Sequence, residues 1–316
     1  MEENNQRPTI YQQVTSTIIS DLKQGSRPWI KPWKCSGMEG LVHRPLRTND
    51  APYNGINILI LWQSAIENGY FSPYWMTYRQ AQSLGGQVQK GEKSTRIVYM
   101  GQHSKDRVDS DDDPEARQTI TFYKAYSVYN ARQIKGLPEK FNNQITPEHS
   151  EDRNQNAEAF LSNTGAVIRV GGDKASYNPP RDFIQMPDIS LFNNSADYYS
   201  TSAHELVHWT GHPKRLERFP SNSHDTTVAY AKEELVAEIG SAFLAADLGL
   251  TLRPRKDHAA YIQSWMRILG SDPKAIFHAA SQAQKAANYL HGLQPKPTHT
   301  PKHELTTPNI MAPSLG

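Results

Sequence analysis

The 316-residue sequence contains a single cysteine, Cys35, and has no long apolar run. One cysteine excludes an internal disulfide, and no apolar stretch approaches the ~20 residues that a transmembrane helix needs. The N-terminus also lacks the basic and then apolar pattern of a secretory signal peptide. Together these absences predict a cytoplasmic protein with no membrane partner.

Net charge is also small, at +2, but it is unevenly distributed along the chain. Residues 1–140 carry 18 Lys and Arg against 14 Asp and Glu, and residues 141–316 carry 16 against 18. Without the acidic segment 101–119, the first part holds 15 basic and 8 acidic residues. A basic first part and a mildly acidic second part indicate that the two parts have different functions.

Apolar periodicity predicts an α+β protein of two domains. The predicted organisation is an N-terminal mixed α/β domain (1–140), a linker (141–156), a mostly helical C-terminal domain (157–290) and a disordered tail (291–316).

In the N-terminal domain, three helices are expected before two β-rich segments, "TRIVYMG" and "TITFYKAYSVYN". The acidic run Asp109–Asp113 between these segments is typical of a solvated loop at the tip of a long hairpin.

In the C-terminal domain a helix is expected from about Ala157, followed by two short strands around a turn. Further helices are expected around His204 and over about 228–248, 256–270 and 273–290.

The segment His204-Glu205-Leu206-Val207-His208 has the H-E-x-x-H spacing of zinc metallopeptidases. On a helix, positions i and i+4 share one face, so both imidazoles can bind one metal ion. Glu205, one step round the helix, is then the candidate general base. The alternative is an ordinary helix that carries three polar residues, and a catalytic site needs a third ligand.

Several residues are candidates for the third ligand. The metzincin pattern requires a histidine where this chain has Lys214, so that family is excluded. His224 and Asp225 have no recognisable spacing. In "YAKEELVAEIGSAFLAADLG", Glu234 is followed by the small Ala237 and then by Glu238 on the same helical face.

We therefore predict His204, His208 and Glu234 as ligands. Glu238 would accept the spare N–H of a ligand histidine, and Glu233 and Glu238 are the alternative ligands. Nitrogen and carboxylate donors favour Zn²⁺, although another divalent metal such as Mn²⁺ also fits. A solvated helix face is the alternative reading of Glu234.

The N-terminal part combines aromatic and basic residues in the way that single-stranded nucleic acid requires. Aromatic faces stack unpaired bases, and cations follow the phosphates. The candidate DNA-binding residues are Trp29, Lys31, Trp33, Lys34, Trp75, Tyr78, Arg79, Lys90, Lys93 and Arg96. Trp29 and Trp33 lie on a proline-spaced segment and are predicted to be exposed or to face a ligand. Trp75 is equally consistent with a DNA-binding position and with the core. Trp62 is assigned to the core.

The chain resembles the ArdC-type antirestriction family in segments from about residue 8 to 290. "YQQVTSTIISDLKQGSRPWIKPW", "PYNGINILILW" and "YSVYNARQIKGLP" look like that family's N-terminal domain, which TraC-type plasmid primases share. "GGDKASYNPPRDFIQMPDISLF", "HELVHWTGHPKRL" and "YAKEELVAEIGSAFL" look like its zincin-like, gluzincin-type metallopeptidase domain.

The resemblance implies a protein that binds single-stranded DNA and protects incoming conjugative plasmid DNA from host restriction. The competing hypothesis is an active zinc protease in which Glu205 is the base and a DNA-associated host protein, such as a restriction component, is the substrate. A purely structural metal is a third reading, against which the intact Glu205 argues.

Overall fold

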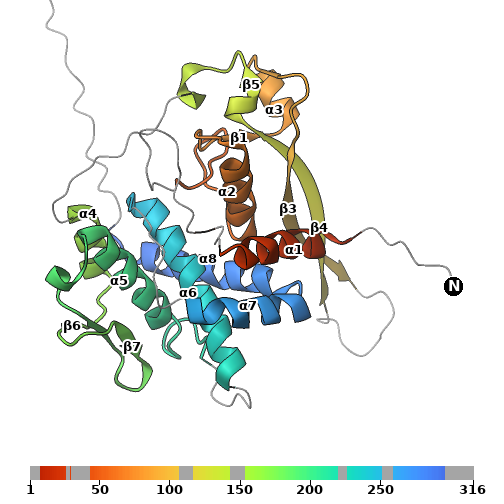
Figure 1. Ribbon diagram of the computed structural model, residues 1–316. Helices are drawn as coiled ribbons and strands as arrows, with labels where there is room; N and C mark the ends of the chain where they lie inside the picture. The colour runs from red at the N-terminus through yellow and green to blue at the C-terminus, as the bar shows by residue number, and fades with distance from the viewer. Residues whose placement is uncertain are drawn as a thin grey trace, which may run out of the picture.

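The structure is a computed structural model, and Figure 1 shows its elements from the N-terminal helix α1 to the C-terminal helix α8. The residues that it describes are 8–25, 29, 43–106, 117–142, 154–219, 226–250 and 259–295. Within them, side chains are described except at 100–123, 226, 259 and 260. None of the helices in these ranges is long and apolar enough to cross a membrane.

The N-terminal part begins with two helices, α1 (Ile10–Lys23) and α2 (Ile56–Asn68). Helix α1 starts at Thr9, whose hydroxyl accepts the backbone N–H of Gln12 in a capping box. Helix α2 ends at Gly69, where the backbone turns with a φ of +69° that other residues rarely adopt.

A long β-hairpin forms the rest of this part, as the period-2 segments predicted. Strands β3 (Thr95–Asp106) and β4 (Arg117–Asn130) are antiparallel, and β1 (Trp75–Met76) extends the sheet on the other side of β4. The short pair β2 (Gln87–Val88) and β5 (Ile134–Lys135) lies beside helix α3 (Tyr78–Ser83). The acidic run Asp109–Asp113 lies outside the described residues.

After helix α4 (Gln155–Asn163), the C-terminal part has a small sheet with the order β6-β8-β7. Its strands are β6 (Ile168–Val170), β7 (Ser176–Asn178) and β8 (Phe183–Met186). The prediction of two strands here is wrong, because the chain reverses twice. The second reversal is a one-turn 3₁₀ helix, Pro179–Arg181, followed by Asp182 with a φ of +51°.

Four helices complete the structure described for this part: α5 (Ser195–Thr210), α6 (Thr226–Leu248), α7 (Ala259–Ser271) and α8 (Ala275–Gly292). Because α8 continues to Gly292 and His291 binds Asp247, the predicted tail starts too early. Residues beyond 295 lie outside the described residues. The α+β class and the division into two domains are confirmed.

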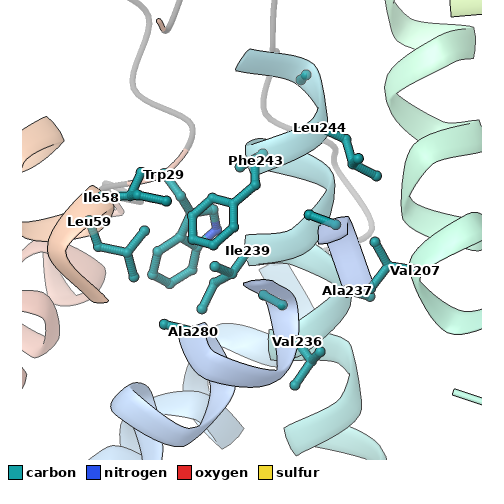
Figure 2. Close-up of a cluster of buried hydrophobic side chains, with 14 of the residues drawn as sticks. Trp29, Ile58, Leu59, Val207, Val236, Ala237, Ile239, Phe243, Leu244 and Ala280 are labelled. Carbon is teal, nitrogen blue, oxygen red and sulfur yellow. The ribbon is translucent and has the colours of Figure 1, made fainter. Parts of the chain in front are cut away.

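The two parts share a hydrophobic core. Figure 2 shows Trp29 among Ile58 and Leu59 of α2, Ile239 and Phe243 of α6, and Ala280 of α8. The rings of Trp62 and Phe243 also meet edge to face at 5.9 Å, which confirms the core assignment of Trp62. Burial of these aromatics therefore stabilises both parts together.

The predicted linker lies between the two parts. Its first residue, Phe141, is buried, and residues 143–153 lie outside the described ranges. Apart from the start of the tail, the boundaries proposed for the domains stay a prediction.

Candidate functional site

Helix α5 presents His204, Glu205 and His208 to helix α6. The side chain of Asn194 caps the helix by accepting the N–H of Asp197, and residues 199–210 are all buried. The two helices approach closely at Gly240, where a Cβ would come within 2.8 Å of Val207. Such close packing brings side chains on facing helices within reach of one ion.

The three predicted ligands lie together in the structure. The Nε2 atoms of His204 and His208 are 3.1 Å apart, and the two carboxylate oxygens of Glu234 lie 3.5 Å and 3.4 Å from them, respectively. All three side chains are buried. Zinc binds such atoms at about 2.0–2.2 Å, and tetrahedral angles then place neighbouring ligand atoms about 3.3–3.6 Å apart. The spacing and the donor types therefore fit a divalent metal.

Each histidine also meets a second carboxylate through its other ring nitrogen. His204 Nδ1 lies 3.9 Å from Glu238 Oε1, and His208 Nδ1 lies 3.3 Å from Glu233 Oε1. Carboxylates in this position fix the tautomer and the ring orientation of a ligand histidine. The hydrogen bond predicted from a ligand histidine to Glu238 is not formed at the 3.9 Å separation, and the sequence placed Glu233, which is closer to its histidine, only among the alternative ligands.

The histidines and carboxylates of the site shift one another's pKa values. Burial lowers the pKa of His208, but hydrogen bonds to Glu233 and Glu234 outweigh burial and raise it to about 10. Burial raises the pKa of Glu234, but its bonds to both histidines hold this pKa well below its usual range. Glu233 and Glu234 therefore favour the positively charged form of His208.

The three ligands and Glu205 line a cleft of about 1380 Å³. Glu205 is buried, whereas Tyr230 and Lys232, which also line the cleft, are exposed. A cleft of this volume, lined by a carboxylate and three metal-binding donors, can accommodate a polypeptide or another extended substrate.

The candidate DNA-binding residues divide into three sets. Trp29 and Trp75 have exposed fractions of 0% and 2%, so neither offers a face to a base. The prediction that Trp29 is exposed is therefore wrong, because tertiary packing against α6 and α7 covers it. An exposed set remains, consisting of Tyr78, Arg79, Lys90, Lys93 and Arg96. The third set, Lys31, Trp33 and Lys34, lies outside the described residues.

The hairpin adds two aromatic residues that the sequence analysis did not select. Tyr99 on β3 and Tyr126 on β4 are 53% and 46% exposed, and their rings meet edge to face at 6.1 Å. Lys124 pairs with Tyr99 across the strands and lies on the same face of the sheet, whereas Arg96, three residues before Tyr99, lies on the opposite face. The sequence contains these tyrosines and cations in two β-rich segments. Which of them lie next to one another depends on the register of the two strands, and the sequence does not give that register.

Two family models match the chain. The N-terminal domain of the anti-restriction factor ArdC matches residues 8–129, and a zincin-like metallopeptidase matches residues 155–282.

Two curated relatives match nearly the whole chain. An uncharacterized protein of Sinorhizobium fredii, y4eC, is 38% identical over 296 residues, which cover 92% of this chain and 94% of that protein. DNA primase TraC of Escherichia coli is 37% identical over 322 residues, which cover 97% of this chain but 29% of the primase.

Among solved structures, the metal-free crystal structure of the antirestriction ArdC protein from plasmid R388 is similar, with a TM-score of 0.76 and 44% identity. The match covers 90% of this chain and 98% of that protein. The Mn(II)-bound structure of the same protein gives a TM-score of 0.73 and 43% identity.

Proposed function

Because the chain belongs to the ArdC family of antirestriction proteins, we propose that it binds single-stranded DNA and protects incoming conjugative plasmid DNA from restriction. The observation that carries this proposal is the likeness to an antirestriction protein over nearly the full length of both chains. The same likeness and the geometry of the site support a divalent metal at His204, His208 and Glu234.

Zinc is the metal that we propose for this site. Two imidazoles and one carboxylate form a donor set typical of zinc with an open position. Affinity alone rarely sets the choice of metal, and the related structure holds Mn(II), so both ions belong in the experiments.

The exposed cations and tyrosines of the N-terminal part support the DNA proposal. Lys90, Lys93 and Arg96 lie in and after the turn that leads into β3, and Tyr99 and Tyr126 follow on the same hairpin. Cations of this kind bind phosphates, and tyrosine faces stack unpaired bases, which duplex DNA does not present. Single strands are therefore expected to bind more tightly than duplex, and more weakly as salt rises.

The DNA proposal is tested on the full chain with a fluorescent oligonucleotide. A Lys90→Ala/Lys93→Ala variant should weaken single-strand binding and flatten its salt dependence. The matched control is Lys232→Ala/Lys285→Ala, which removes two exposed charges from the C-terminal helices. Equal losses in the two variants would contradict a DNA surface on the N-terminal part.

The antirestriction proposal is tested by the survival of an unmodified plasmid transferred into a restricting host. Wild type should protect the plasmid, and the Lys90→Ala/Lys93→Ala variant should protect it less. Protection that is absent in wild type, with the protein folded and expressed, would exclude the proposed function.

A second candidate function is proteolysis, which the position of Glu205 favours. Its carboxylate is buried in the same cleft as the three ligands, where it can accept a proton from an attacking water molecule. A metal bound there would supply Lewis-acid chemistry. The substrate in this reading is a host protein associated with DNA, such as a restriction component.

Glu205→Gln separates the two functions, because it keeps the shape of the side chain and removes the base. If protection needs cleavage, this variant should lose protection while metal and DNA binding stay at wild-type levels. Full protection by Glu205→Gln would remove proteolysis from the antirestriction mechanism.

A further inference from the structure

Trp29 reaches the metal centre from the N-terminal part of the chain. Its indole N–H donates to Glu238 Oε2 at 3.4 Å, across a separation of 209 residues. The ring is completely buried and packs edge to face on Trp265 at 6.1 Å. Figure 2 shows this ring against α6, the helix that supplies Glu238.

Glu238 connects this indole to a metal ligand. One carboxylate oxygen faces Trp29, and the other lies 3.9 Å from His204 Nδ1. If His204 binds metal through Nε2, its Nδ1 carries a hydrogen that needs a fixed acceptor. The orientation of the Glu238 carboxylate therefore affects how well the His204 ring is held.

The other ligand histidine has an equivalent support that comes from its own domain. Glu233, which faces His208 Nδ1, accepts hydrogen bonds from the Nε and Nη2 atoms of Arg218 at 3.1 Å and 2.8 Å. Arg218 lies only ten residues after His208 along the chain. His208 thus faces a carboxylate held by its own domain, and His204 faces, at the longer distance of 3.9 Å, a carboxylate that Trp29 contacts from the N-terminal part.

We propose that Trp29 is a positioning residue for the metal centre, so that the N-terminal part completes a site whose ligands all belong to the C-terminal part. This inference rests on the proposed metal binding at His204, His208 and Glu234. It implies that metal binding and the packing of Trp29 in the core are thermodynamically linked. Metal binding should then stabilise the packed position of Trp29, and the packed position should raise metal affinity.

The test uses the full-length protein with Trp29→Phe, which keeps an aromatic ring in the core and removes the N–H donor. Zn²⁺ and Mn²⁺ affinities are measured by competition with a chromophoric chelator. Loss of the carboxylate that contacts a ligand histidine typically weakens metal binding about 10–100-fold. Trp29 acts one contact further from the metal, so we expect Trp29→Phe to weaken metal binding about three- to tenfold. The rise in melting temperature on adding metal should be smaller than in wild type.

The matched control is Trp62→Phe, because Trp62 is also buried and its N–H also donates, to the carbonyl of His43 at 2.8 Å. It packs on Phe243 of α6 but has no contact with Glu238 among those that the structure describes. This control should lower the melting temperature and leave metal affinity unchanged. Glu238→Gln should weaken metal binding more than Trp29→Phe, and adding Trp29→Phe to it should cause little further loss.

Wild-type metal affinity in Trp29→Phe, or equal weakening in Trp29→Phe and Trp62→Phe, would overturn the inference and leave the metal site standing. If wild type binds neither Zn²⁺ nor Mn²⁺, the inference and the metal proposal fail together. Single-strand DNA binding by Trp29→Phe should equal that of wild type, because a buried ring stacks no base. A selective loss of DNA binding with intact metal affinity would return Trp29 to the role that the sequence predicted.

Discussion

The proposed metal centre and the proposed N-terminal DNA surface differ in how far a short sequence pattern determines where side chains lie. In the metal centre, three residues selected by helical spacing lie with their ligand atoms 3.1–3.5 Å apart. In the N-terminal part, two tryptophans selected for DNA lie in the core. Helical spacing fixes neighbours locally, whereas the side that an aromatic residue faces depends on the whole fold.

Removing a predicted metal ligand should give the largest loss of metal binding. If it does not, the ligands predicted from the sequence are wrong. Glu234→Ala is expected to lose stoichiometric metal, because only two histidines would remain to hold the ion. Metal content of the purified variants, measured by mass spectrometry, checks this. Glu205→Gln is the control and should retain the metal, since Glu205 is not a ligand.

The opposite pattern is informative. A full site in Glu234→Ala together with an empty site in Glu238→Ala would show that the wrong carboxylate was chosen as ligand.

The second largest effect tests the buried tryptophans. Trp75 is 2% exposed, its backbone carbonyl accepts the Tyr53 hydroxyl, and its ring meets Tyr70 at 5.9 Å. Trp75→Ala should therefore cost about 3–5 kcal/mol of stability by leaving a cavity. Denaturant unfolding of the full chain measures the cost. Unchanged stability with weakened DNA binding would restore the sequence-based role of Trp75.

A third prediction concerns the junction between the two regions. Arg44 donates to both carboxylate oxygens of Asp247 on α6, at 2.8 Å and 2.9 Å, and His291 donates to the same carboxylate. Burial raises the pKa of Asp247, but His291 and Arg44 outweigh burial and lower it below its usual value of 3.8. Charge-assisted bonds of this kind make Asp247→Asn destabilising by about 1.5–3 kcal/mol at neutral pH.

The sign of the pH dependence follows from the lowered pKa. The Asp247 contribution is fully present above the unfolded pKa of about 4 and is lost as pH falls through the lower folded value. Melting temperatures of wild type and Asp247→Asn should therefore differ at pH 5 and above and converge in more acidic buffer. A difference that persists unchanged in acid would show that the Asp247 charge does not hold the two regions together.

The sequence contained most of the metal centre but only part of what supports it. His204, Glu205 and His208 were selected by spacing on one helix, whereas the selection of Glu234 and Glu238 on a second helix also rested on the resemblance to gluzincin metallopeptidases. Arg218 and Trp29 were not predicted to support the site, because one lies in an irregular segment after α5 and the other lies 209 residues from its partner. Contacts of that kind depend on how helices and strands pack against one another. The repeat of apolar residues along a single helix or strand does not predict that packing.

The fold shows the same limit. Hairpin β3–β4 and helices α5 and α6 follow from long periodic segments, but the three short strands β6, β7 and β8 appeared as two. Each has only three or four residues, too few for a clear alternation, and the turn at Pro179–Arg181 is needed to separate β7 from β8.

The smallest predicted effect concerns the exposed tyrosines, which replace the buried tryptophans as candidate stacking residues. Tyr126 is 46% exposed beside Tyr99, so Tyr126→Ala should leave unfolding stability nearly unchanged. If its ring stacks a base, the same change should cost about 1–3 kcal/mol of single-strand binding. Tyr126→Phe keeps the ring and should bind as wild type does, which distinguishes stacking from a hydroxyl contact. Wild-type binding by Tyr126→Ala would leave the basic residues as the described source of DNA affinity and would remove stacking at this hairpin from the proposal.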